Sequence, residues 1–282
     1  MRYAIKVSMT IRFPSVFYRF TMYQLMAFFL WLVFAIAIII SFTGHLSFSP
    51  SHIAGSGLYL IIACYSINFF LAKIFSVNPK PYSATITGLI LSLIVGPLPL
   101  APNFIPLTLL AAIAMASKYL LVVNQRPLFN PAALAVLTTA FVLKLGASWW
   151  IGLPTILPLI VIGGLIVTLR ANRIQSTIAF TITYLTVSFI TQLSITTWLL
   201  PAPIWFFILV MLVEPLTSPN SLKSQIAYGT LVALIYLLLP LFLNTYPYPL
   251  ETALLLGNLF SFSLRRQNQV KADKSLQSAS TT

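Results

Sequence analysis

The stretch GLILSLIVGPL, residues 88–98, recurs 118 residues later as FFILVMLVEPL, residues 206–216. Five of the eleven aligned positions are identical, and Pro97 aligns with Pro215. The same ungapped offset aligns Pro131 with Pro249. Apolar sequence produces chance matches among leucine, isoleucine and valine, so the paired prolines are the stronger signal. We interpret the chain as two related halves; the alternative is a coincidence between two apolar stretches.

Composition places these halves in a membrane. Hydrophobic residues make up 59% of the 282 residues, and charged residues make up only 7%. A soluble domain carries about 25% charged residues. The composition therefore excludes a soluble enzyme, a disordered chain and a nucleic-acid-binding domain, and it predicts an all-α integral membrane protein.

Ten apolar segments are long enough to be membrane-spanning helices, which need about 20 apolar residues each. We place them at residues 23–43, 55–75, 82–100, 104–122, 130–147, 150–169, 175–195, 197–214, 224–244 and 248–265. The offset of 118 residues covers five of these segments, and an odd number inverts the second half relative to the first. The predicted organisation is a basic N-terminus (1–22), two inverted five-helix repeats (23–147 and 148–265) and a polar basic tail (266–282).

The basic residues set the predicted orientation. With ten spans, fifteen of the sixteen lysines and arginines fall on one side, and only Lys144 falls toward the other. Cytoplasmic loops are enriched in lysine and arginine, so we expect both termini in the cytoplasm. The N-terminal segment suits the surface of a membrane, and the long run after it suits a retained span rather than a cleaved signal peptide. The membrane would be an inner or plasma membrane or one of thylakoid type.

The sequence lacks the motifs of several enzyme and metal classes. It has one cysteine, Cys64, and two histidines, His45 and His52, which lie in one connection without an acid nearby. A metal site held by protein ligands is therefore not expected. There is no Gly-rich nucleotide loop and no nucleophile elbow, so we predict no catalytic residue.

Two polar clusters in the first half interrupt the apolar pattern. The first opens the span at residue 82 and offers Thr85, Thr87 and Gly88. It is either an anion site at a helix N-terminus or an ordinary cap with a close-packing glycine. The second cluster contains Lys118, Arg126, Asn130 and Pro131. These residues are candidates for binding a phosphate, a lipid headgroup or a planar heterocycle. The alternative is a helix cap together with basic residues that only set the membrane orientation.

The second half contains the stretch Glu214-Pro-Leu-Thr-Ser-Pro-Asn220. Two prolines four residues apart rule out a regular helix, and a broken backbone at membrane depth needs protein or a cavity to satisfy it. Thr217 and Ser218 are candidates for cofactor binding. Glu214 could coordinate a cation, relay a proton or pair with a lysine, and Glu251 is a second acid for an ion pathway.

Taken together, these clusters resemble one family in the same order along the chain: the RnfD/NqrB family, whose members are membrane components of the Rnf electron-transport complex and of the sodium-pumping NADH:quinone reductase. The resemblance extends from about residue 80 to 262. It is carried by ITGL (86–89), KYL (118–120), FNPA (129–132), EPLTSP (214–219), YG (228–229), ETA (251–253) and GNLF (257–260). It implies ten helices in an inverted repeat and electron transfer within the membrane, coupled to Na⁺ or H⁺ movement. Other membrane redox subunits would be its partners.

The resemblance also implies a flavin, either FMN or riboflavin, and in one branch a quinone. Family members attach FMN to the threonine of a Ser-Gly-Ala-Thr motif between spans five and six. Here that connection is the short Leu145–Trp150, with Ser148 where the threonine would stand. Ser148 has the hydroxyl that a phosphoester needs, but the loop is nearly absent. We therefore expect non-covalent rather than covalent flavin.

Two functions from other classes compete with the redox subunit. One is a transporter or channel for a small solute on the same inverted-repeat fold, which the lost attachment loop favours. The other is a structural membrane component of a larger complex, whose polar clusters only stabilise broken helices. Fold alone does not decide between these functions.

Overall fold

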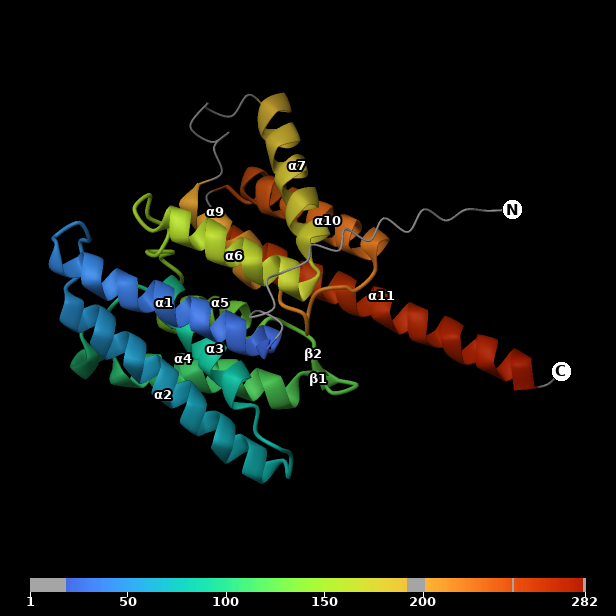
Figure 1. The fold of residues 1–282 in the computed structure, drawn as a ribbon, viewed down its shortest axis with the longest axis horizontal. Coiled ribbons are helices and arrows are strands. Elements are labelled where there is room, and N and C mark those ends of the chain that lie inside the picture. The colour runs from blue at the N-terminus through green and yellow to red at the C-terminus, as the bar shows by residue number, and fades with distance from the viewer. Residues whose placement is uncertain (1–18, 192–200, 245, 281–282) are drawn as a thin grey trace.

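A computed structural model of the chain describes residues 19–191, 201–244 and 246–280. Nearly all of its regular structure is helical (Figure 1). The first half contains α1 (Met22–Phe42), α2 (Pro50–Ile74), α3 (Pro81–Ile94), α4 (Leu100–Leu120), β1 (Val122–Val123), β2 (Arg126–Pro127) and α5 (Pro131–Leu143). The second half contains α6 (Leu157–Ala171), α7 (Ile174–Ile190), α9 (Ala202–Phe206), the π-helix η2 (Phe207–Met211), α10 (Leu222–Phe242) and α11 (Pro249–Ser280).

These helices have the length and surface of membrane-embedded elements. Four of those described, α1, α2, α4 and α10, are long and apolar enough to cross a bilayer, and five shorter segments are also apolar. Large apolar side chains are exposed on their outer faces, with Phe42 at 76% and Phe242 at 80%. In water such a surface would be costly, whereas lipid tails solvate it. The predicted all-α membrane protein is confirmed.

The predicted segments each overlap a described helix, and they differ mainly at their ends. The segment predicted at 82–100 ends early, at Ile94, because Gly96, Pro97 and Pro99 stop the helix. Residues 197–200 of the segment predicted at 197–214 lie outside the described residues, and the rest contains the short α9 followed by η2. The last helix continues beyond 265 to Ser280, through most of the predicted polar tail. Most of the predicted interfacial N-terminus, up to residue 18, lies outside the described residues.

The end of α3 is capped by the connection that joins the two halves. The backbone N–H groups of Ser148 and Trp149 donate to the carbonyl of Ile94 at 2.9 and 3.0 Å. Val95 pairs with Ala147 in an antiparallel bridge. The Trp150 indole donates to the carbonyl of Ser92 at 3.0 Å. These bonds satisfy backbone groups that the broken helix leaves without partners.

The second broken segment is satisfied by side chains of neighbouring helices. Thr168 of α6 donates to the carbonyl of Leu209 at 3.2 Å, and Thr177 of α7 donates to that of Ile208 at 3.0 Å. Both acceptors lie in η2, where the wider winding shifts the regular hydrogen bonds. After η2 the backbone turns, and the N–H groups of Thr217 and Ser218 donate to the carbonyl of Glu214.

Helix contacts repeat from the first half to the second. In the first half α1 packs on α3, α2 on α4, and α4 on α5; in the second, α6 packs on α9 and η2, α7 on α10, and α10 on α11. Between the halves, α1 contacts α6 and α5 contacts α11, and Figure 1 shows α1 beside α6. Pro131 and Pro249 both stand first in their helices, α5 and α11. Pro97 and Pro215 both lie in the breaks that precede α4 and α10.

Basic residues lie at one end of the molecule: Arg126 in β2, Arg173 before α7 and Arg265 in α11. Figure 1 shows the β1–β2 hairpin and the α6–α7 turn at the same end. Hydrogen bonds from Arg173 to Asn220 and from Arg265 to the Leu216 carbonyl bring the 212–221 break to this end as well. We call it the basic end. Lys144, the C-cap of α5, lies in the connection at the opposite end of that helix.

Candidate functional site

The two most distinctive motifs of the sequence meet at the basic end. Asn130 is the N-cap of α5, and its side-chain oxygen accepts from the N–H groups of Ala132 and Ala133, both at 3.1 Å. Its amide nitrogen donates to Glu214 Oε2 at 2.8 Å, across 84 residues of sequence. One asparagine side chain therefore caps a helix of the first half and binds the acid of the second half.

Asn258 of α11 extends this junction. Its side-chain oxygen accepts from the backbone N–H of Asn130 at 2.8 Å, and its amide donates to the Tyr228 hydroxyl at 3.2 Å. Asn130, Asn258 and Tyr228 are almost completely buried. Residues from α5, α10, α11 and the 212–221 break thus form one connected polar network, which we call the Asn130–Glu214 junction.

Lys118 lies near this junction at the end of α4. Its ammonium group donates to the carbonyl and the hydroxyl of Ser83 at 2.7 and 2.9 Å, which ties α4 to the first turn of α3. No hydrogen bond or ion pair joins it to Glu214 among the described residues, so the two groups can affect each other only through longer-range electrostatics. Among the described residues, the Glu214 carboxylate is bonded instead to the Asn130 amide.

Lys118 also lines a cavity of about 570 Å³ between α2, α3 and α4. Lys80, Ser83, Tyr119 and Asn68 share its lining. Asn68 is 3% exposed, its oxygen accepts from the Tyr119 hydroxyl at 2.8 Å, and its amide nitrogen has no partner among the described residues. A buried donor without an acceptor is costly, and the residue that carries this donor lines the cavity. We call this cavity the Lys118 pocket.

The remaining candidates of the first half contribute to packing around the pocket. Thr87 is buried and donates to the Ser83 carbonyl at 3.0 Å, and Thr85 is half-buried. Gly88 lies against α2, where an added Cβ would come 2.7 Å from the Cα of Ile61. Pro131 is buried as the first residue of α5. None of these four residues lines the Lys118 pocket.

Thr217 and Ser218 are buried in the 212–221 break, and Arg173 binds Ser218. Ser218 donates to the Glu214 carbonyl at 2.7 Å and accepts from Arg173 Nε at 3.0 Å. Arg173 also donates to Asn220. Burial and the charges of Arg126 and Arg265 lower the pKa of Arg173. Several arginines therefore gather around this break without an acid bonded to them among the described residues.

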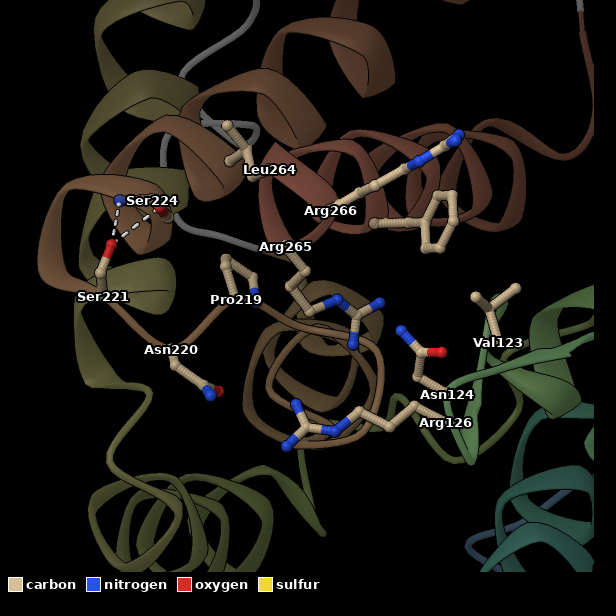
Figure 2. Close-up of a pocket in the computed structure, with 11 residues that line it drawn as sticks. Val123, Asn124, Arg126, Pro219, Asn220, Ser221, Ser224, Leu264, Arg265 and Arg266 are labelled. Carbon is tan, nitrogen blue, oxygen red and sulfur yellow. Dashed lines mark hydrogen bonds between the residues drawn. The ribbon is translucent and has the colours of Figure 1, made fainter. Parts of the chain in front are cut away.

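Arg126 belongs to this group and lines a second cavity, of about 480 Å³ (Figure 2). The hairpin places it there, because Asn124 and Gln125 both adopt positive φ, as a tight two-residue turn between antiparallel strands requires. Arg265 and Arg266 of α11 line the same cavity. The structure therefore separates Arg126 from the Lys118 pocket and groups it with α11.

The predicted candidates Ser148 and Glu251 lie at the opposite end. Ser148 is exposed, and its hydroxyl is 3.4 Å from the Ile94 carbonyl that its backbone N–H also binds. Glu251 is 1% exposed and accepts from the Trp149 indole at 3.0 Å, in the first turn of α11. The structure brings Glu214 together with Asn130 and Lys118, but it does not bring Glu251 to them.

Sequence reasoning did not single out Asn68, Arg173 and Arg265 as site residues. Asn68 had a detectable signal, since an asparagine within an apolar helix is costly unless it is bonded. In the sequence, Arg173 and Arg265 indicated only the membrane orientation of the chain. Their contacts become visible only when α7 and α11 pack against the 212–221 break.

Among the described residues no group of three or more histidine, cysteine or acidic side chains could hold a metal ion. Comparison of the sequence with models of known protein families and with curated proteins finds no match.

Proposed function

We propose that this chain is a membrane electron-transfer subunit that holds a flavin or a quinone, without a covalent bond, in the Lys118 pocket. It would work as one component of a membrane oxidoreductase complex, with other redox subunits as partners. The observation that carries the proposal is the placement of the motif residues: Asn130 bonds Glu214 at 2.8 Å, and Lys118, which bonds Ser83 of α3, lines the pocket.

The residues of the pocket fit such a cofactor. Flavin and quinone rings carry carbonyl oxygens that accept hydrogen bonds. The unpartnered Asn68 amide and the ammonium groups of Lys80 and Lys118 are donors that suit them. The cavity of about 570 Å³ also lies within the range of small-molecule and cofactor sites. When bound, the cofactor would supply the capacity to accept and release electrons.

The residues around the cofactor have separate roles in this proposal. Asn68 and Lys118 would orient its carbonyl edge, and the positive charge of Lys118 would stabilise a reduced, anionic ring. A change of charge in the pocket would change how strongly Glu214 binds a cation or a proton, which would couple the redox state of the cofactor to ion binding. Glu251, at the other end of the bundle, would belong to the same ion pathway.

The absorbance spectrum of the purified protein tests the proposal. We expect flavin or quinone bands near one equivalent, which Asn68→Leu reduces strongly because it removes a donor from the pocket. Asn103→Leu, which replaces an asparagine outside the pocket, should leave the bands unchanged. Flavin fluorescence should leave the protein on denaturing electrophoresis; fluorescence that stays with the band and disappears in Ser148→Ala would instead show a phosphoester at Ser148. A folded protein with neither flavin nor quinone bands would contradict the redox function.

We further propose ten membrane crossings in two inverted five-helix repeats, with both termini in the cytoplasm. The repeated helix contacts and the paired prolines support this topology, as does the gathering of cationic residues at one end. A reporter fused after residue 148 should then be located outside the cytoplasm. A cytoplasmic reporter at that site would overturn the ten-span topology.

A small-solute transporter on the same fold is the second candidate. It is favoured by the use of residues 147–150 to cap α3, because this leaves no free loop for flavin attachment. A folded protein that carries neither flavin nor quinone bands would favour the transporter over the electron-transfer subunit.

A further inference from the structure

The cavity that contains Arg126, which we call the arginine pocket, is built from three parts of the chain that are distant in sequence. The β1–β2 hairpin contributes Arg126, the 212–221 break and the start of α10 contribute Asn220, Ser221 and Ser224, and α11 contributes Arg265 and Arg266. Figure 2 shows the guanidinium groups of Arg126 and Arg265 pointing into the space between these elements, with the Asn124 and Asn220 side chains beside them.

The charge of this pocket is not balanced within the described part of the chain. Its lining contains three arginines and no acid. Arg265 donates to the Leu216 carbonyl at 2.6 Å, which is a neutral acceptor. The side chains of Arg126 and Arg266 have no hydrogen-bond or ion-pair partner among the described residues, and the side chain of Glu214, the acid of the nearby break, is bonded to Asn130. Mutual repulsion of like charges is relieved when an anion binds.

The other lining groups suit a phosphate. Ser221 is the N-cap of α10 and lines the pocket, so the positive end of that helix lies at its edge. The hydroxyl of Ser221 donates to that of Ser224 at 2.7 Å, and the Asn220 side chain lies between these serines and the arginines (Figure 2). Guanidinium groups match phosphate oxygens in geometry and charge. Phe262 and Leu264 add apolar surface next to these donors.

We propose that the arginine pocket binds a phosphate-bearing anion at the basic end of the molecule. The phosphate belongs either to an anionic phospholipid of the cytoplasmic leaflet or to a soluble phosphate compound. The site is separate from the Lys118 pocket, so it does not depend on the proposed redox function.

The full-length protein in detergent tests this site through its unfolding temperature. Added phosphatidylglycerol is compared with phosphatidylcholine, and inorganic phosphate is compared with chloride at equal ionic strength, since a ligand that binds the folded state raises the transition. Stabilisation by phosphatidylglycerol alone identifies a lipid site, and stabilisation by inorganic phosphate identifies a site open to soluble ligands.

Arg126→Gln should weaken the apparent affinity for the stabilising anion by about tenfold or more, because it removes a charged donor. Its side chain has no partner in the described chain, so the variant should keep its fold. Arg126→Lys should recover part of the affinity, and Arg19→Gln, which removes an exposed arginine outside the pocket, should leave it within about twofold. The proposal is overturned if neither anion stabilises the protein, or if Arg126→Gln and Arg19→Gln respond alike.

Discussion

Replacing Glu214 with alanine should destabilise the folded protein by about 2–3 kcal/mol, the cost of leaving a buried polar group and a nearby charge without their partner. Asn130 would lose the acceptor of its amide, which lies 2.8 Å from Glu214 Oε2. The measurement is the midpoint of thermal unfolding in detergent. An unchanged midpoint would show that the Asn130–Glu214 junction contributes nothing to stability.

Two further variants separate the hydrogen bond from the charge. Glu214→Gln keeps an oxygen that can accept from Asn130 but removes the charge beside Lys118, so we expect it to recover part of the lost stability. A double-mutant cycle with Asn130→Ala isolates the coupling between the two side chains, because Asn130→Ala alone also removes the cap of α5. If the variants act additively, the two residues do not interact energetically.

Replacing Gly229 with alanine should disrupt the packing of α10 on α7. The added Cβ would lie 2.2 Å from the carbonyl oxygen of Ser176, which belongs to the backbone of α7 and can move only with the helix. Forcing extra volume into a packed contact costs about 1–3 kcal/mol. The thermal midpoint of Gly229→Ala should therefore fall well below that of the wild type.

Gly55→Ala provides the matched control for this substitution. Gly55 also lies within a helix, α2, but nothing lies within 4 Å of its added Cβ. Alanine favours a helix over glycine by up to about 1 kcal/mol, so this variant should be unchanged or slightly more stable. Equal losses in the two variants would show that the close approach at Gly229 is not what limits stability.

The sequence alone predicted the class of the fold well because membrane helices leave a strong compositional signal. Apolar runs located the helices, and the prolines at 97 and 215 marked both breaks. The ends of the helices were harder to predict, because apolar sequence can continue beyond the end of a helix. Leu212 and Val213 are apolar, for example, but η2 ends at Met211. Short-range turn chemistry at Asn124 and Gln125 was also missed, because the two-residue hairpin is bounded by no clear strand pattern.

The candidate site was predictable in part for a related reason. Asn130 and Glu214 stood out as polar residues next to prolines, and the structure joins them. The grouping of Arg126 with Arg265, and of Lys118 with Asn68, depends on which helices are neighbours. Which helices are neighbours is decided by long-range packing, and the number of charged residues in each loop does not reveal it.

The connection that joins the two halves has a second consequence for how the protein can be divided. Residues 147–150 belong to the link between repeats, yet they complete the backbone bonding of α3 in the first repeat. A chain cut before Ser148 would give a first fragment in which the carbonyl groups of Ser92 and Ile94 lose these hydrogen-bond donors. The first half of the chain therefore depends on residues 147–150 to complete the backbone hydrogen bonds at the end of α3.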